Sequence, residues 1–492
     1  MRRWLAAALA AGCLTLWASP AYAGRRAEVL VADSAALASA MSTATAGTTV
    51  VLADGDYTIG KLSAKLGTRD APVTIRAAHP GLARITGGQL EVKDSEYVVV
   101  RGLDLANTNT LKVTASRYVR LTDNHFRLGT ASGTHWVLIS GENSGHNRID
   151  HNTFEHKTVL GNYVTVYGGQ SQVSQYDRID HNLFADETAQ DTNGGEAIRL
   201  GVSQLSESSA HATVEYNLFA DCDGDAEIVS VKTSDNTVRY NTFRESAGVL
   251  SARRGDRNAF YGNVFLGNGK PGTGGVRLYG EDQLVYDNYF AGLTGSGFTA
   301  AIQLDGGTVT ADADHTDPSL WAEHWQVRHA VVTHNTFVGN ASNVDSGANY
   351  TYPPVDSVVA DNVVVGSTSP LYHEAKPPTG QTYQGNVAWP TGAATVGLDL
   401  PADQIRVVDP KLVADGEIAH LAVGSPAVDA ATGDFPYVTD DVDGQPRDAR
   451  PDTGADELST APATRHPLTA DEVGTSWRPC CPGGTAGAVP PG

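Results

Sequence analysis

The chain has 492 residues, a formal net charge of −21 and 52 glycines, but only four cysteines. A strongly acidic chain repels nucleic acid and anionic membranes, so we expect neither as a partner of the mature protein. So few cysteines exclude a disulfide-framed domain, and the fold therefore has to depend on a hydrophobic core.

The N-terminus has the features of an export signal. Two arginines precede an apolar run that ends at Trp17, and Ala21–Ala23 (AYA) forms a small-x-small cleavage site. We therefore expect residues 1–23 to be a signal peptide and the mature protein to be periplasmic or secreted. The apolar run is too short to span a bilayer, and lipoprotein anchoring at Cys13 is the less favoured alternative.

The start of the mature chain predicts a short helix and then a strand. Residues 31–45 are rich in Ala and Ser, with apolar residues at helical spacing and Asp33 or Ser34 as N-cap. Residues 48–52 predict the first strand, with a turn at residues 54–56. Such a helix would cap the open first coil of a solenoid.

From residue 124 onward a triplet of Asn, any residue and Phe or a substitute recurs. The repeated asparagines are Asn124, Asn152, Asn182, Asn217, Asn241, Asn263, Asn288 and Asn335, with weaker copies at Asn362 and Asn386. Steps of 22 to 35 residues, with one of 47, are typical of a solenoid built from strands. We therefore predict an all-β fold: a right-handed parallel β-helix, wound as a single-stranded solenoid, with a short N-terminal capping helix.

Each repeated residue has a predicted structural role. An inward Asn at a turn can bond the coils above and below it, which makes a ladder. The Phe two residues later points to the same side of the strand and fills the core.

Two segments depart from the repeat. The long step contains an insertion, residues 308–324, rich in Asp, His and Thr, which we expect to form a loop over one face. Beyond Val407 the repeat fades, and residues 441–457 are expected to form a closing layer of loops. The β-helix domain is thus set to residues 24–457, and the Pro/Gly-rich residues 458–492 are expected to form a poorly ordered tail.

Polar and charged residues recur at a similar phase after the repeated Asn in four successive coils. They are Asn193, Asp225, Glu227, Lys232, Arg253, Arg254 and Arg277. Similar phase places side chains on one side of a solenoid, so we expect them to share a cleft. The first three offer only oxygen ligands, which suits a hard cation such as Ca²⁺. The alternative is a surface carboxylate pair balanced by the basic groups.

Several short motifs together carry a resemblance to a known family. The strongest are GDAEIVSVK at residues 224–232 and SARRGD at residues 251–256. The supporting motifs are NGGEAIR at 193–199, NTFEHK at 152–157, GGVR at 274–277, DGQPR at 443–447 and TGADE at 453–457. In combination they resemble polysaccharide lyase family 6, which contains alginate lyases and chondroitinase B, over residues 27 to 457.

The resemblance implies a right-handed parallel β-helix that performs Ca²⁺-assisted β-elimination on an anionic, uronate-containing polysaccharide. By motif position Lys232 matches the general base and Arg253 the general acid. Asn193, Asp225 and Glu227 match the calcium ligands. The family usually has Glu where this chain has Asp225, which shortens one ligand arm.

The residue types agree with this chemistry. A lysine acts as a base only when neutral, so its usual pKa of about 10.4 has to be lowered by burial or cationic neighbours. Arg253 stays protonated and suits charge stabilisation, or proton donation through a water, better than free-acid catalysis. Arg254 (commonly His in the family), Arg277, Arg199 and Lys157 are expected to bind carboxylates at neighbouring sugar subsites.

The alternatives differ in their products. We expect alginate as substrate in preference to dermatan sulfate, and a monomer as the oligomeric state. A β-helix glycoside hydrolase would use Asp225 and Glu227 around a water and would leave Lys232 and Arg253 without a role. A uronan C5-epimerase would isomerise the polymer without cleaving it, and a non-catalytic β-helix would bind carbohydrate without turnover.

Overall fold

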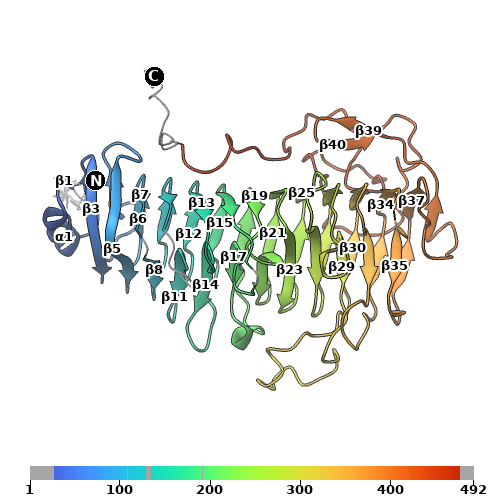
Figure 1. The fold of residues 1–492 in the computed structure, drawn as a ribbon, viewed down its shortest axis with the longest axis horizontal. Helices are drawn as coiled ribbons and strands as arrows, with labels where there is room; N and C mark the ends of the chain where they lie inside the picture. Colours follow the sequence, from blue (N-terminus) through green and yellow to red (C-terminus); the bar gives the residue numbers. More distant parts are fainter. Residues whose placement is uncertain (1–26, 108, 129–134, 191, 369, 477–492) are drawn as a thin grey trace, which may run out of the picture.

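The computed structural model of the protein describes residues 27–107, 109–128, 135–190, 192–368 and 370–476. It confirms the predicted all-β parallel β-helix, whose coils stack along one long axis (Figure 1). The predicted signal peptide, the alternative anchor at Cys13 and the end of the predicted tail lie outside the described residues. Within the described ranges, no helix is both long enough and apolar enough to cross a membrane.

Each regular coil contributes one strand to each of three parallel sheets, which we name A, B and C in chain order. Sheet A contains β1 (Ala27–Val31), β2 (Thr48–Leu52), β4 (Val73–Ala77), β6 (Val98–Arg101), β9 (Arg120–Thr122), β12 (Arg148–Asp150), β15 (Arg178–Asp180), β18 (Thr213–Glu215), β21 (Thr237–Arg239), β24 (Ala259–Tyr261), β27 (Leu284–Tyr286), β30 (Val331–Thr333), β33 (Val358–Ala360) and β36 (Thr382–Gln384). Sheet B contains β7 (Asp104–Leu105), β10 (His125–Phe126), β13 (Thr153–Lys157), β16 (Leu183–Glu187), β19 (Leu218–Cys222), β22 (Thr242–Arg244), β25 (Val264–Leu266), β28 (Tyr289–Ala291), β31 (Thr336–Val338), β34 (Val363–Gly366), β37 (Asn386–Pro390) and β38 (Ile405–Val407).

Sheet C carries the face on which the candidate site lies. It contains β8 (Leu111–Thr114), β11 (Val137–Ser140), β14 (Val164–Gly168), β17 (Ile198–Leu200), β20 (Glu227–Lys232), β23 (Gly248–Arg254), β26 (Thr273–Leu278), β29 (Ile302–Leu304), β32 (Val344–Ser346) and β35 (Tyr372–Glu374). Near the N-terminus, β3 (Gly55–Ser63) and β5 (Ala83–Lys93) are long enough to pair along both sheets B and C. Two short 3₁₀ helices, η1 (Ser203–Leu205) and η2 (Gly297–Thr299), lie in the connections.

The repeated asparagines form the predicted ladder, at the corner between sheets A and B. For Asn217, the side-chain oxygen accepts both the backbone N–H and the side-chain amide of Asn182, each at 2.9 Å. Its own amide nitrogen donates to the backbone oxygens of Ile179 and Glu215 and to the side-chain oxygen of Asn241. All ten repeated asparagines are fully buried, so each coil is hydrogen-bonded to the next through its interior.

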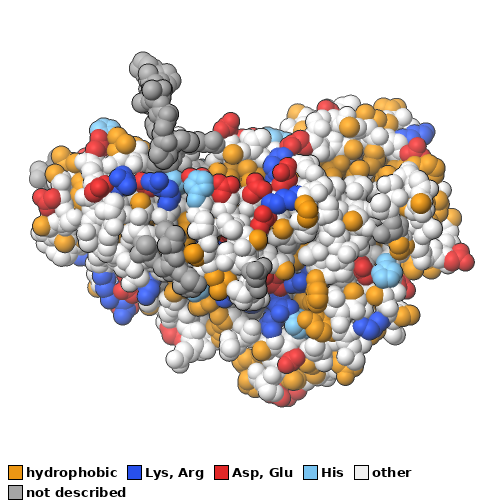
Figure 2. Space-filling view, viewed as in Figure 1, with side chains coloured by type: hydrophobic (Ala, Val, Ile, Leu, Met, Phe, Trp, Pro, Cys, Tyr) orange, Lys and Arg blue, Asp and Glu red, His pale blue; other side chains and the backbone are white. Residues whose placement is uncertain are grey.

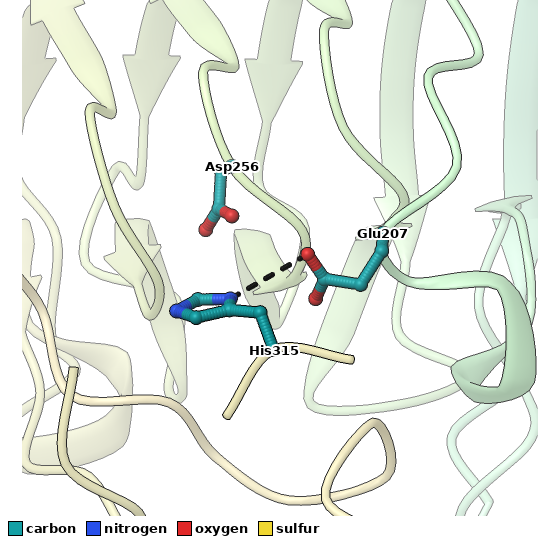
Figure 3. A group of neighbouring side chains, drawn as sticks. All are labelled: Glu207, Asp256 and His315. Carbon is teal, nitrogen blue, oxygen red and sulfur yellow. Dashed lines mark ion pairs between the residues drawn. The ribbon is translucent and has the colours of Figure 1, made fainter. Parts of the chain in front are cut away.

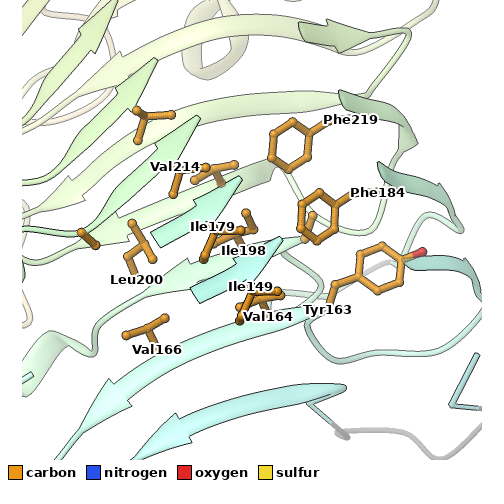
Figure 4. Packing of buried hydrophobic residues seen from close by; sticks show 14 of the residues in the cluster. Ile149, Tyr163, Val164, Val166, Ile179, Phe184, Ile198, Leu200, Val214 and Phe219 are labelled. Carbon is orange, nitrogen blue, oxygen red and sulfur yellow. The ribbon is translucent and has the colours of Figure 1, made fainter. Parts of the chain in front are cut away.

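The phenylalanines of the repeat form a continuous stack beside this ladder. Ring centroids from Phe126 to Phe337 are 4.4 to 5.0 Å apart in successive coils. Figure 4 shows Phe184 and Phe219 beside aliphatic side chains of sheets A and C, such as Ile179 and Leu200. The predicted role of the phenylalanines in one continuous core is confirmed.

The first coil is capped as predicted. The helix α1 (Ser34–Thr43) has Asp33 as its N-cap, which accepts the Ala36 N–H at 2.8 Å, and it buries Leu37 and Met41. The predicted turn at residues 54–56 is wrong in position, because Gly55 already pairs with Ala83 at the start of β3.

The C-terminal part of the chain covers sheet B. The hairpin of β39 (Leu412–Asp415) and β40 (Ile418–Leu421) and the loops that follow pack over its last coils (Figure 1). Residues 458–476 then run back along the solenoid, where Leu468 N–H donates to Thr242 and Val473 packs against Leu183 and Leu218. This part of the predicted tail is therefore fixed by apolar burial and hydrogen bonds.

Candidate active site

The predicted cluster of charged residues lies on the outer face of sheet C. Ile198 and Leu200 point into the core, so Arg199 between them points outward. The strand register places Ser230, Ser251 and Arg277 next to Arg199 in the three following coils. The register thus brings Arg277, predicted from its phase, to one face with Arg199, which was expected at a sugar subsite.

Lys232 lies in a largely buried position on this face. Its register partner in the next coil is Arg254, and 12% of its side chain is exposed. Burial lowers the pKa of Lys232, the positive charges of Arg199 and Arg254 lower it further, and the carboxylates of Glu196 and Glu227 oppose the shift. The amine is therefore closer to its neutral form than an exposed lysine would be.

Glu196 links Lys232 to Arg199, and the sequence analysis assigned it no role. It is fully buried, with one carboxylate oxygen 3.4 Å from Lys232 Nζ and the other 2.5 Å from Arg199 Nη2. Asn162 Nδ2 also donates to this carboxylate, at 2.8 Å. The only signal in the sequence was the position of Glu196 three residues before Arg199.

Glu227 orients two arginines beside the lysine. Its Oε1 lies 3.5 Å from Arg253 Nε and accepts a hydrogen bond from Arg277 Nη2. Its Oε2 accepts from Ser230 Oγ at 2.5 Å. Glu227 is only 3% exposed, so these contacts lie away from solvent and fix both guanidinium groups.

Asp225 lies at the edge of this cluster, against the backbone that directly follows Asn193. Asp225 Oδ2 accepts the backbone N–H groups of Gly194 and Gly195, at 2.7 and 3.2 Å. Its Oδ1 and the exposed side chain of Asn193 form no hydrogen bond within the described residues. Burial raises the pKa of Asp225, and the nearby carboxylates of Glu196 and Glu227 raise it further.

A further buried carboxylate, Glu187, lies close to Asp225 and is paired with Lys157. Glu187 is 2% exposed, its Oε2 has no hydrogen-bond partner among the described residues, and burial raises its pKa to about 7. The charges of Glu196 and Asp225 also raise that pKa. The oxygen donors of Asn193 and Asp225 are of the type that suits a hard cation such as Ca²⁺.

Comparison with known proteins places the chain in a family. The sequence model of the family described as Chondroitinase B matches residues 31–373, well over half of the chain. The chain belongs to polysaccharide lyase family 6. No curated protein matches this sequence.

Solved structures of family 6 lyases have the same fold. The alginate lyase AlyGC superposes with a TM-score of 0.75 at 24% identity, covering 92% of this chain and 59% of that one. A mannuronic acid specific family 6 lyase from the human gut microbiota gives 0.65 at 25% identity, covering 74% and 87%. A family 6 lyase from Pseudopedobacter saltans gives 0.62 at 19% identity, covering 92% and 99%. The chain thus spans about three fifths of the length of AlyGC.

One residue expected at a sugar subsite of this family 6 chain is not at the surface. Lys157 is fully buried and its Nζ donates to Glu187 Oε1 at 2.7 Å. His156, just before it, has a positive φ of 61°, which interrupts the alternation of β13 and turns Lys157 inward. In this structure Lys157 neutralises Glu187, which corrects its predicted contact with substrate.

The insertion forms one wall of the site. Thr308 N–H donates to His324 O at 2.7 Å and closes the base of the loop, which protrudes beyond sheet C in Figure 1. Arg254, predicted to bind substrate, is 8% exposed and donates to the backbone oxygens of Trp321, at 3.1 Å, and Ala322. Figure 2 shows Lys and Arg side chains gathered beside the base of this loop.

His324, at the end of the insertion, contacts Arg253 directly. Its Nε2 faces Arg253 Nη1, and its ring stacks on Tyr350 with centroids 4.4 Å apart. Burial, with the positive charges of Arg253 and Arg254, lowers the pKa of His324 to about 3, so the ring is neutral and accepts the guanidinium hydrogen bond. The sequence analysis located the insertion but gave His324 no role.

Proposed function

We propose that this protein is a lyase that cleaves a uronate-containing polysaccharide, alginate in preference to dermatan sulfate, by β-elimination. The observation that carries the proposal is the largely buried Lys232 amine, whose pKa is lowered and which lies beside Arg199 and Arg254 on the outer face of sheet C. A glycoside hydrolase would have no use for such a lysine, because it needs carboxylates placed around a water.

The elimination requires a base and a group that stabilises negative charge. The base removes the C5 proton of the uronate, a double bond forms between C4 and C5, and the bond from C4 to the glycosidic oxygen breaks. We assign proton removal to neutral Lys232 Nζ. Arg253, held by Glu227 and His324, stabilises the developing charge and donates to the leaving oxygen directly or through a water.

Substrate carboxylates need cationic partners along the same face. Arg199 is exposed enough to offer one, since 16% of its side chain is accessible and Tyr167 Oη lies 3.3 Å from its Nη1. Arg277 and Arg254 are more deeply buried. We assign Arg277 to orienting Glu227, and Arg254 to holding the insertion. Both would also contact a sugar directly where the substrate chain crosses them.

The residues that would hold Ca²⁺ are Asn193, Asp225 and Glu227. Their fit is supported by the oxygen atoms of Asn193 and Asp225 that accept no hydrogen bond from the described residues. Both oxygens of Glu227 accept hydrogen bonds, from Arg277 and Ser230, so Glu227 would exchange one of these partners for the ion. A bound Ca²⁺ neutralises a uronate carboxylate and so makes the neighbouring C5 proton easier to remove. Asp225, shorter than the usual Glu, sets how tightly this site holds the ion.

Alginate is the first choice of substrate because AlyGC is described as an alginate lyase and the gut enzyme as mannuronic acid specific. Dermatan sulfate is the second, because the matching family model is described as Chondroitinase B.

One assay tests the proposed function. The protein is incubated with poly-mannuronate, poly-guluronate and dermatan sulfate, with and without Ca²⁺, and the products are sized while near-ultraviolet absorbance is followed. We expect shortened, unsaturated products that absorb in the near ultraviolet from an alginate block. Saturated products with a new reducing end would support a hydrolase, an isomerised polymer of full length would support an epimerase, and binding without turnover would support a non-catalytic role. Each of these three outcomes contradicts the proposal.

We also propose that the protein is exported after cleavage behind Ala23, because the first 23 residues have the pattern of a signal peptide. N-terminal sequencing of protein recovered from the periplasm and the medium tests this. A chain that keeps its N-terminus in the cytoplasm would contradict it.

A further inference from the structure

A second cluster of ligand-type side chains joins the insertion to the turns of the solenoid. Glu207 lies in the loop after η1, Asp256 in the turn after β23, and His315 in the insertion. Figure 3 shows the three side chains converging from separate segments. One ligand atom of each lies within 4.8 Å of the other two.

Asp256 is a buried carboxylate whose charge is poorly compensated. It is 7% exposed, and its Oδ1 accepts the backbone N–H of Glu281 at 2.8 Å. Its Oδ2 accepts no hydrogen bond, and the carboxylate forms no ion pair, in the part of the chain that the structure describes. In Figure 3 this carboxylate points toward His315 and Glu207. A cation bound beside this carboxylate would offset the cost of burying its charge.

The imidazole of His315 is held with one nitrogen toward these carboxylates. Its ring stacks on Trp325, with centroids 4.1 Å apart, and its Nε2 lies 3.3 Å from the backbone oxygen of Ala311. When Nε2–H donates to that oxygen, Nδ1 presents its lone pair to Glu207 Oε2, 3.6 Å away. The lone pair and the carboxylate oxygen repel each other in this tautomer, and the repulsion is removed either by a proton on Nδ1, which gives ion pairs to Glu207 and Glu281, or by a metal ion between the two atoms. Histidines that bind metals commonly donate their other N–H to a carbonyl in this way.

We propose that Glu207, Asp256 and His315 bind one divalent first-row metal ion of the Zn²⁺ type. One imidazole nitrogen and two carboxylate oxygens suit Zn²⁺ better than Ca²⁺, which takes six or more oxygen ligands. The site is separate from the oxygen-rich group at Asn193, Asp225 and Glu227, and it does not depend on the proposed function.

The metal would fasten the insertion next to the candidate active site. Asp256 follows Arg254 by two residues, and Arg254 donates to the insertion at Trp321 and Ala322. The metal would thus add a second attachment on the same turn, and the insertion would keep His324 against Arg253.

The test measures Zn²⁺ directly. The full-length protein, kept in saturating Ca²⁺, is titrated with Zn²⁺ against a fluorescent chelator, and bound zinc is counted after desalting. We expect the wild type to hold one Zn²⁺ that Asp256→Asn and His315→Ala bind more than about tenfold more weakly. Glu207→Gln, on a half-exposed loop, gives a third variant that leaves the core intact. His79→Ala is the matched control, because it removes an exposed histidine that belongs to none of the ligand-type groups found among the described residues.

A second readout follows the insertion itself. We expect Zn²⁺ to slow proteolytic cleavage within residues 308–324 of the wild type and of His79→Ala, and to have no such effect in His315→Ala. The proposal is overturned if the wild type holds no Zn²⁺, or if Glu207→Gln and Asp256→Asn retain the same zinc content and affinity as the wild type.

Discussion

Replacing Asn217 by Ala removes one rung from the middle of the asparagine ladder. The side chain donates three hydrogen bonds, to Ile179 O, Glu215 O and Asn241 Oδ1, and accepts two from Asn182. Some partners keep other bonds, because Glu215 O still accepts His181 N–H and the Asn182 amide still donates to Ile149 O. The backbone N–H of Asn182 loses the only acceptor that it has among the described residues.

The loss in the free energy of unfolding follows from these hydrogen bonds. An orphaned buried N–H costs about 1–3 kcal/mol, and the lost bonds to Ile179 O and Asn241 Oδ1 contribute about 1 kcal/mol each, while the two groups that keep other bonds add little. We therefore expect Asn217→Ala to lower the free energy of unfolding by about 3–5 kcal/mol. The control is Asn109→Ala, which removes one exposed bond to Gly88 O and should cost about 1 kcal/mol or less.

Urea unfolding followed by circular dichroism and by tryptophan fluorescence measures this difference, and two probes are needed because solenoids can unfold in parts. If Asn217→Ala unfolds at the same urea concentration as Asn109→Ala, the ladder does not stabilise the coils and the reasoning is refuted.

Three further predictions concern the site. Glu196→Gln removes a carboxylate that raises the pKa of Lys232, so the acidic limb of the kcat/KM–pH profile should move to lower pH; an unchanged or alkaline-shifted limb would contradict this. Asp225→Glu restores the longer ligand arm, so half-maximal activity after chelation and Ca²⁺ readdition should need less Ca²⁺ than in the wild type, and an equal or higher requirement would count against the assigned ligand. Arg254→Ala frees the carbonyls of Trp321 and Ala322, so limited proteolysis should cut the insertion faster; wild-type resistance would show that Arg254 does not anchor it.

The repeat made most of the fold predictable from the sequence. An Asn and a Phe that recur once per coil indicate which positions lie inside the solenoid, because each coil has to present the same groups to its neighbours. The N-cap at Asp33 was predictable for a similar local reason, since it depends on residues only three apart.

The finer parts of the site depend on features that spacing does not encode. Lys157 points inward because the positive φ of His156 shifts the alternation of the strand by one position. The contact of Glu196 with Lys232 joins residues 36 positions apart in the chain, so it could be identified only from the structure. The path of the insertion back to Arg253 and Arg254 is set by tertiary contacts, and sequence composition alone predicted only a loop.

The most direct test of the Lys232 assignment compares Lys232→Ala with the wild type and with Lys61→Ala, which removes an exposed lysine of an early coil. The measurement is the initial rate of near-ultraviolet absorbance with alginate in saturating Ca²⁺, with circular dichroism as the check on folding. We predict unsaturated products from the wild type and Lys61→Ala, and a rate lower by at least about 100-fold for Lys232→Ala. A folded Lys232→Ala protein that forms these products at the wild-type rate would contradict the role of this lysine as the base.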